Sequence, residues 1–239
     1  MEEMNILKTY LESKNIQSID GMLRKFGTYM DGVLEWNEMV NLTSITEPTE
    51  FMVKHFIDSI ICAEFPEYKE AAKIIDVGTG AGFPGVPLAI VSPEKEFVLM
   101  DSLGKRLRII DELCQRADIQ NVTTLHARAE ELARNKAHRE QYDLCVSRAV
   151  ASMAVLAEYC LPFIKVGGFL MAYKGPDAEK EAADAESALS LLGGRVVEIR
   201  RGGLEEFGLD HRIVVIKKIK STPSKFPRKA GTPTKEPLK

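Results

Sequence analysis

The feature that most constrains the fold of this chain lies at residues 74–85, where an apolar run ends in a carboxylate and continues directly into alternating glycines. The apolar run is typical of a buried parallel strand, and the glycines are typical of the tight loop at the carboxyl edge of such a sheet. Glycine permits positive φ and close approach of a ligand, while the next helix offers free N–H groups. The stretch predicts a ligand-binding loop in an α/β protein; a glycine-rich turn without a ligand is the alternative.

The glycine spacing separates two classes of ligand. A dinucleotide fingerprint, G-x-G-x-x-G, needs a third glycine three positions after the second, and counted from Gly78 and Gly80 that position is Phe83. The carboxylate of Asp76, just before the loop, would repel a pyrophosphate and attract an ammonium group. These features favour S-adenosyl-L-methionine, which has an ammonium group and no phosphate, over a nicotinamide cofactor. A nicotinamide-dependent Rossmann reductase remains the alternative.

The rest of the chain from residue 73 predicts strict alternation of strands and helices, and hence a doubly wound parallel sheet. Strands are expected at 73–77, 97–100, 122–126, 142–146, 168–173, 195–200 and 212–216, with helices at 86–91, 105–117, 152–161 and 177–192. The last two strands are joined by a loop, which indicates that the last one is antiparallel. This is the pattern of the class I methyltransferase fold, a Rossmann-like seven-stranded sheet. We assign residues 67–219 to this core.

Residues 1–66 are expected to form a helical extension that packs on the core. One apolar stripe follows 4-3-4-3-4 spacing and comprises Met22, Phe26, Tyr29, Val33, Trp36 and Val40. A polar loop near Asn41 precedes a helix that begins at Pro48. In that helix His55, Asp58 and Ser59 share one face. They form either part of a site or a hydrogen-bonded cluster or cap on the surface.

Charge and cysteine usage limit the environment of the protein. The 23 residues from Lys217 onward hold eight basic residues and one acid, which leaves 24 basic and 34 acidic residues upstream. We expect the Pro-rich tail, 220–239, to be disordered or extended when alone, and to serve either as an RNA contact or as a solubilising tail. The four cysteines have no metal or disulfide spacing, and neither a signal peptide nor a membrane span is predicted. We expect a cytoplasmic protein with no membrane and no metal.

The ends of the other strands supply further candidate residues, because ligands bind outside the carboxyl ends in such sheets. Asp101 could accept hydrogen bonds from ribose hydroxyls. Ala129 could present its N–H to an adenine ring nitrogen and Glu130 its carboxylate to the exocyclic amine, although an acid there also suits a helix start. Arg148 could hold a methionine carboxylate or a phosphate.

The strand-four end also limits the chemistry of the methyl acceptor. It has Ser147-Arg148-Ala149 in place of the Asp/Asn-Pro-Pro-aromatic segment that many enzymes use to hold an exocyclic amine. Pyrimidine C5 methylation needs a cysteine nucleophile in a loop at a strand end, and none is predicted there. By elimination the methyl acceptor is a nucleophile that needs neither a segment to hold an amine nor a cysteine nucleophile. A purine ring nitrogen with an in-plane lone pair meets this condition.

Motifs over nearly the whole chain resemble the ribosomal RNA small-subunit methyltransferase G family, with matches at 41–43, 55–59, 76–85, 101–106, 128–131, 147–149, 174–175 and 227–233. The resemblance implies an enzyme that methylates N7 of one guanine in the decoding-region loop of 16S ribosomal RNA, with S-adenosylmethionine as cofactor and the RNA or small subunit as partner. The implied cofactor contacts are Gly78, Gly80, Phe83, Asp101, Ala129, Glu130 and Arg148. The candidate RNA contacts are Asn41, His55, Asp58, Ser59, Lys174, Arg228 and Lys229.

Three further expectations follow from the implied function. A guanine N7 has no hydrogen, so no general base is expected, and single substitutions at His55, Asp58 or Asp101 should not behave like loss of one. Gly78→Ala or Phe83→Ala should weaken cofactor binding with little change in stability. We expect a monomer, and the alternative to an enzyme of this kind is a regulatory module that binds S-adenosylmethionine without catalysis.

Overall fold

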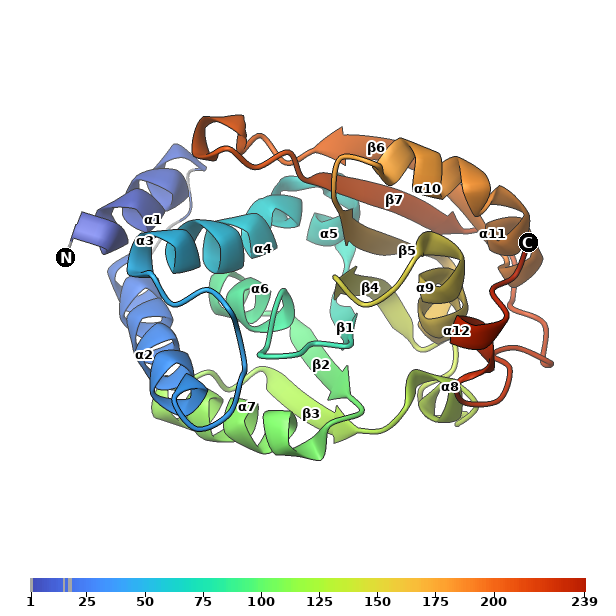
Figure 1. Ribbon diagram of the computed structural model, residues 1–239, viewed down its shortest axis with the longest axis horizontal. Helices are drawn as coiled ribbons and strands as arrows, with labels where there is room; N and C mark the ends of the chain where they lie inside the picture. The colour runs from blue at the N-terminus through green and yellow to red at the C-terminus, as the bar shows by residue number, and fades with distance from the viewer. Residues whose placement is uncertain (1, 15, 17–18) are drawn as a thin grey trace.

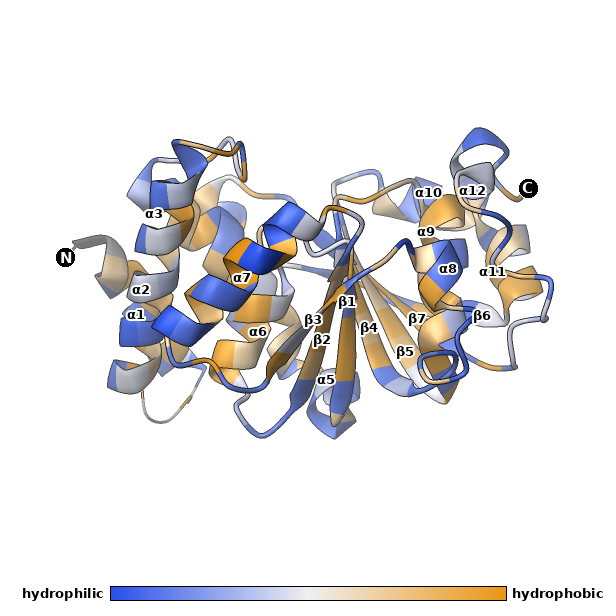
Figure 2. Cartoon of the chain, turned by 90° about the horizontal axis from the view of Figure 1, so that it is seen from below, coloured by the Kyte–Doolittle hydropathy of each residue, from blue (hydrophilic) through white to orange (hydrophobic). Residues whose placement is uncertain are grey.

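The computed structural model describes residues 2–14, 16 and 19–239. A seven-stranded sheet lies between two layers of helices (Figures 1 and 2). Its order is β3-β2-β1-β4-β5-β7-β6, and the strands are β1 Lys73–Val77, β2 Glu96–Asp101, β3 Val122–His126, β4 Tyr142–Arg148, β5 Ile164–Lys174, β6 Gly194–Arg201 and β7 Arg212–Lys218. The predicted strand–helix alternation and the class I methyltransferase topology are therefore confirmed.

The sheet is parallel from β3 to β5 and antiparallel at the edge formed by β7 and β6. β1 pairs in parallel with β2 and β4, whereas β7 is inserted between β5 and β6 and is antiparallel to both. The antiparallel last strand is the one expected from the sequence. Because β7 runs the other way, its first residue, Arg212, pairs with Lys174 at the carboxyl end of β5. The start of β7 thus lies at the edge of the sheet where ligands bind in this class of fold.

Helices from the N-terminal part cover one face of the sheet (Figure 1). They are α1 Glu2–Ser13, α2 Ile19–Asn37, α3 Pro48–Phe51, the π-helical turn η1 Met52–Ile57, α4 Asp58–Ile60, the 3₁₀ turn η2 Ile61–Glu64, α5 Pro66–Glu70, α6 Gly85–Val91 and α7 Gly104–Arg116. The other helical elements are α8 Ala129–Leu132, α9 Met153–Cys160, η3 Leu161–Phe163, α10 Ala178–Asp184, α11 Glu186–Leu192, η4 Glu205–Phe207 and α12 Thr232–Lys235.

Two hydrophobic clusters fill the spaces on either side of the sheet, as the orange strands of Figure 2 indicate. Successive strand residues point to opposite faces, so Leu144 and Val146 join the cluster under α2, α6 and α7, while Cys145 joins the one under α9 and α11. The four cysteines are buried free thiols. Within the described part of the chain, no helix combines the length and the apolar character needed to cross a membrane.

The C-terminal tail is folded, contrary to the expectation of a disordered or extended segment. Phe226 is buried in the second cluster, and α12 packs against α9. Arg139 donates to the carbonyls of Phe226 (2.9 Å) and Thr222 (2.7 Å). Composition indicated disorder because the tail is rich in proline and charge, but a buried aromatic ring and carbonyls that accept hydrogen bonds from an arginine of the body hold it in place.

The helix expected over 177–192 is in fact two helices. α10 ends at Asp184 and α11 starts at Glu186, with Ala185 between them. The long N-terminal helix likewise ends at Asn37, earlier than the apolar stripe, which continues to Val40. Asn37 Oδ1 instead accepts hydrogen bonds from the backbone N–H groups of Leu42 and Thr43 at 2.8 and 2.9 Å. This side chain therefore fixes the loop that leads to α3.

Candidate cofactor and substrate site

The glycine loop between β1 and α6 adopts conformations that favour glycine. Gly78 and Gly80 have φ of +76° and +62°, in the left-handed region. A Cβ at Gly78 would lie 2.6 Å from Cγ2 of Val150, whereas one at Gly80 would meet open space. The first glycine therefore permits close packing with the segment after β4. The second leaves an uncovered main chain facing the pocket.

Asp76 does not face that pocket, contrary to the sequence-based expectation that it attracts an ammonium group. The side chain is fully buried and is not among the residues that line either pocket described below. Its Oδ2 accepts from the Thr79 hydroxyl at 2.7 Å and from the Gly85 N–H at 2.9 Å. Its Oδ1 has no hydrogen-bond partner among the described residues, and burial raises the pKa of Asp76 to about 7. Asp76 thus holds the loop from inside.

Asp101 at the end of β2 forms one wall of the site. Its Oδ2 accepts from the Gly80 N–H at 3.0 Å, and its Oδ1 accepts from the Leu103 N–H at 2.8 Å. The Arg106 guanidinium approaches Oδ2 to 4.0 Å. The carboxylate is therefore oriented by two main-chain donors and placed where ribose hydroxyls would find an acceptor.

A first pocket of about 310 Å³ opens between these residues and the start of α8. It is lined by Gly78, Asp101, Ala129 and Glu130, which the sequence predicts as cofactor contacts. Glu130 is nearly buried, and its Oε1 accepts from the Gly231 N–H at 2.8 Å. The pocket has the size and the polar ends that suit a nucleoside.

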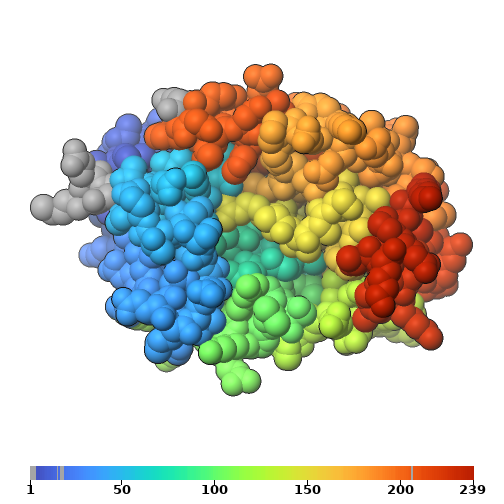
Figure 3. Space-filling view, in the orientation of Figure 1, coloured from blue at the N-terminus to red at the C-terminus, as the bar shows by residue number. Residues whose placement is uncertain are grey.

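A second and larger cavity, about 880 Å³, adjoins the first and shares Gly78, Arg106 and Ala149 with it. Figure 3 shows the surface hollowed between the blue N-terminal segments and the yellow segments that follow β4. Predicted residues that line this cavity are Gly78, Gly80, Phe83, His55, Asp58, Arg148 and Lys174. Together the two pockets have room for a cofactor and for part of a second substrate.

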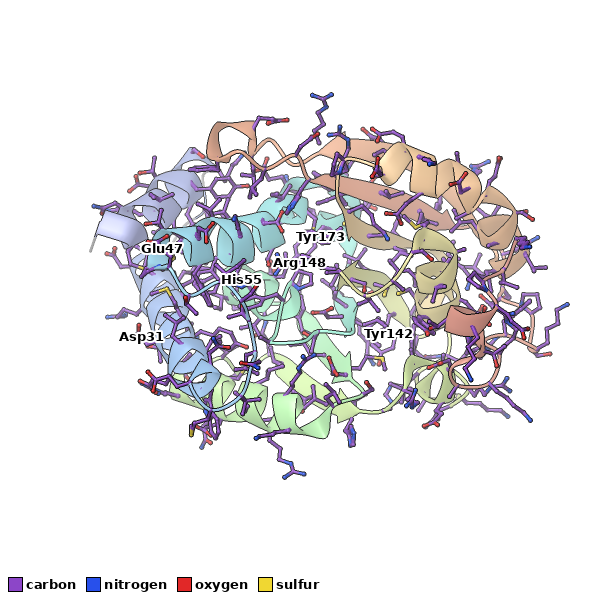
Figure 4. All side chains as sticks on the ribbon, in the orientation of Figure 1. Asp31, Glu47, His55, Tyr142, Arg148 and Tyr173 are labelled. Atoms are coloured by element: carbon purple, nitrogen blue, oxygen red, sulfur yellow. The ribbon has the colours of Figure 1, made fainter. Side chains whose placement is uncertain are left out.

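One wall of the larger cavity is a network built on Asp58, which is fully buried. Its Oδ2 accepts from Arg148 Nη1 at 2.7 Å, and its Oδ1 lies 2.7 Å from His211 Nδ1. Arg148 also donates to the Lys54 carbonyl at 3.0 Å and lies over the Phe83 ring, 5.5 Å from its centroid. Figure 4 shows His55, Arg148 and Tyr173 close together near the centre of the molecule.

His55 is held in one tautomer by this network. Its ring stacks on Phe83 with 4.4 Å between centroids. Arg148 has only donors, so His55 Nδ1 accepts from it at 3.3 Å and Nε2–H donates to Thr43 Oγ1 at 2.7 Å. Burial, with the charge of Arg148, lowers the pKa of His55 to about 3. His55 is therefore neutral at physiological pH, with both nitrogens occupied.

The hydrogen bonds of the network favour the charged forms of Asp58 and His211. Hydrogen bonds from His211 and Arg148 outweigh the effect of burial and lower the pKa of Asp58. The hydrogen bond to Asp58 raises the pKa of His211. The cavity thus presents an ionised, fully bonded carboxylate whose partners Arg148 and His211 face the space.

His211 was missed by sequence reasoning, although a signal for it existed. It directly precedes β7, which the sequence predicts to be antiparallel, and an antiparallel strand begins where its parallel neighbours end.

Tyr29 of α2 was expected only as part of an apolar stripe. The Tyr29 hydroxyl donates to the Ala81 carbonyl at 2.9 Å. A Cβ on Gly82 would lie 2.2 Å from the oxygen of this hydroxyl. The N-terminal helix therefore supports the glycine loop directly.

The remaining predicted RNA contacts are distributed over several elements. Asn41 is exposed on the loop before α3, and Ser59 is buried and donates to the His55 carbonyl. Lys174 donates to Glu181 Oε2 at 2.8 Å. Arg228 forms a bidentate pair with the buried Glu158, whereas Lys229 is exposed. Only Asn41 and Lys229 of this set are exposed on the surface.

The fold and these two adjoining pockets define a class I S-adenosylmethionine-dependent methyltransferase. The fold is similar to a candidate O-methyltransferase from Klebsiella pneumoniae (TM-score 0.54, 12% identity, 80% of this chain and 90% of that chain). It is also similar to NSun6 from Pyrococcus horikoshii (TM-score 0.51, 14% identity, 70% and 52%). Among the described residues, no three ligand-type side chains are grouped to hold a metal ion.

Sequence comparison then gives the family. Residues 22–207 match the GidB family, described as rRNA small subunit methyltransferase G. The chain is 49% identical, over 239 residues and the full length of both chains, to ribosomal RNA small subunit methyltransferase G of Alkaliphilus oremlandii. It is 47% identical over 98% of its length to the protein of that name from Clostridium novyi, of which it covers 96%. The chain belongs to the rRNA small subunit methyltransferase G family.

Proposed function

We propose that this protein transfers the methyl group of S-adenosylmethionine to N7 of a guanine in the decoding-region loop of 16S ribosomal RNA. Membership of the family, over the whole chain, supports small-subunit ribosomal RNA as the substrate. The observation that carries the proposal is the pair of adjoining pockets over one glycine loop. One accommodates a nucleoside, and the other leaves space for the methionine part and an extruded base.

The residues present fit this cofactor. The uncovered main chain at Gly80, the oriented carboxylate of Asp101 and the nearly buried Glu130 provide acceptors and close approach for an adenosine. Arg148, which lines the larger cavity, would hold the methionine carboxylate. When bound, S-adenosylmethionine supplies an electrophilic methyl group on sulfur.

The chain's own contribution is positioning. Guanine N7 offers a lone pair and no proton, so the protein has to align the nitrogen with the methyl carbon and sulfur and keep the base out of its stack. The site suits this role, since both nitrogens of His55 and both oxygens of Asp58 are engaged in hydrogen bonds. Neither group is available to remove a proton from the substrate.

The direct test is transfer of labelled methyl from S-adenosylmethionine to small-subunit RNA, followed by mapping of the modified base. We expect one labelled guanine, with the label at N7. Label on an exocyclic amine or on a pyrimidine would contradict the proposal. Binding of S-adenosylhomocysteine without any transfer would favour the regulatory module instead.

The mechanism predicts a pH profile as well. With RNA and cofactor saturating, the single-turnover rate should be nearly flat across neutral pH, because no base has to be deprotonated. Substitution of His55, Asp58 or Asp101 should lower the rate or the affinity without adding a pH dependence. A fall in rate toward acid that disappears in one of these variants would show that an essential base exists.

A further inference from the structure

The folded C-terminal segment lies against the wall of the nucleoside pocket. Two of its residues bond to residues that line this pocket. The Gly231 N–H donates to Glu130 Oε1 at 2.8 Å, and Thr234 Oγ1 lies 2.8 Å from the Tyr159 hydroxyl. Figure 1 shows the same arrangement, with α12 beside α8 and α9.

A strong anchor holds the segment there. Arg228 donates from its backbone N–H (2.7 Å), its Nε (3.0 Å) and its Nη2 (2.7 Å) to the carboxylate of Glu158. Glu158 is fully buried, so these charge-assisted bonds act away from water, where they are strong. Phe226, two residues earlier, is buried in the core. The position of Gly231 is therefore fixed relative to Glu130.

The bond from Gly231 determines which way the Glu130 carboxylate turns. With Oε1 held by a main-chain donor, Oε2 has no partner among the described residues and belongs to the pocket that Glu130 lines. A carboxylate oxygen accepts from a 6-amino group, whereas it repels the carbonyl oxygen of a 6-oxo purine. The orientation of Glu130 thus sets a preference for adenine.

We propose that the C-terminal segment completes the nucleoside site and that Gly231 is a positioning residue for adenine recognition through Glu130. This inference rests on the proposed cofactor. It assigns to the tail a task separate from RNA binding, namely discrimination between 6-amino and 6-oxo purines. The Pro-rich tail with its excess of basic residues is then part of the cofactor pocket.

The test compares the affinities of the full-length protein for S-adenosylhomocysteine and for its deaminated analogue, S-inosylhomocysteine, by calorimetry. The wild type should prefer the amino compound. Gly231→Pro removes the donor, and because proline cannot adopt the φ of +79° at this position, it also moves the main chain away from Glu130. Loss of one hydrogen bond to a charged group should reduce this preference at least about tenfold. In the Glu130→Gln background, Gly231→Pro should have no further effect on the preference.

A second variant and a control complete the design. Arg228→Lys keeps the charge opposite Glu158 but loses the bidentate geometry, so it should shift the preference in the same direction by a smaller factor. Lys235→Ala, in α12 and exposed, should leave the preference unchanged. If the wild type binds neither compound, the proposed cofactor fails. If it prefers the amino compound and both Gly231→Pro and Arg228→Lys keep that preference in full, the role of the tail is overturned and the cofactor stands.

Discussion

Phe83 serves the hydrophobic core as well as the pocket. Its ring is 6% exposed and contacts Tyr29 at 6.2 Å and Phe51 at 5.8 Å between centroids, besides its stack with His55. Removing such a ring costs about 3 kcal/mol or more. The expectation that Phe83→Ala would weaken cofactor binding with little effect on stability therefore needs correction. A glycine variant is the cleaner probe of the site.

Gly80→Ala is expected to weaken S-adenosylhomocysteine binding by at least tenfold, since its methyl group would enter the open space over the loop. Gly203→Ala is the matched control, because Gly203 has a similar φ of +68° and open space around its Cβ. Both substitutions should cost about 1 kcal/mol of stability through backbone strain. Calorimetry with equal affinities for both variants would remove Gly80 from the site.

The buried Asp76 predicts an unusual dependence of stability on pH. Burial raises its pKa in the folded state from 3.8 to about 7, so its contribution is fully present below about pH 4 and is lost as the pH rises through 7. Asp76→Asn keeps one side-chain oxygen that can accept from both Thr79 and Gly85, but it cannot ionise. Between pH 4 and 8 the wild type should lose up to about 4 kcal/mol relative to this variant. Urea unfolding at several pH values measures the difference, and parallel profiles would contradict it.

Among the elements, the tail departs most from its composition. Four prolines among threonines and lysines suggest a solvated segment, yet buried contacts at both of its ends fix its path over the surface. Lys218 Nζ is buried and donates to the Leu161 carbonyl at 2.5 Å and to Thr222 Oγ1 at 2.6 Å. Phe226 and Arg228 then fix the second half.

Phe226→Ala should therefore destabilise the protein by about 3 kcal/mol, as for other buried aromatic rings. Its neighbour Ser224 is exposed, and Ser224→Ala should change stability by less than about 0.5 kcal/mol. The urea midpoint gives both values, and limited proteolysis should show faster cleavage of the tail only in the first variant. An unchanged midpoint for Phe226→Ala would mean that the tail contributes nothing to the fold.

The molecule as a whole separates its charges along the chain. The tail from Lys217 onward carries an excess of seven positive charges, while the rest has an excess of ten negative ones. An acidic body repels RNA, so the basic residues beside the pockets determine where RNA can approach. Deleting the tail to test this would also remove Phe226 from the core, so substitution of exposed lysines is preferable.

The double variant Lys229→Gln, Lys235→Gln should flatten the salt dependence of RNA binding by ~0.7 to 0.9 per lost phosphate contact in a log–log plot. Lys69→Gln, Lys165→Gln is the matched control. These lysines are also exposed, but they precede β1 and begin β5, at the opposite edge of the sheet. Equal slopes for the two double variants would show that the tail makes no phosphate contacts.

Local patterns in the sequence were sufficient for the sheet and for much of the site. Strand and helix periods, and a glycine loop after an apolar run, depend on near neighbours, so β1 to β7 and the positions of Gly80 and Asp101 could be predicted. Ala129 and Glu130 followed from one rule, that ligands bind at the carboxyl ends of strands. The antiparallel β7 followed from the loop that connects it to β6.

Only the tertiary structure decided what touches these residues from far along the chain. Tyr29 under the glycine loop, His211 on Asp58 and Gly231 on Glu130 are separated from their partners by 52, 153 and 101 residues. No local period encodes such contacts, because each depends on how whole helices and strands pack. The sequence correctly predicted that Asp76 lies near the end of β1, just before the glycine loop, but not that its side chain is buried instead of facing a ligand. That burial depends on how the whole loop packs.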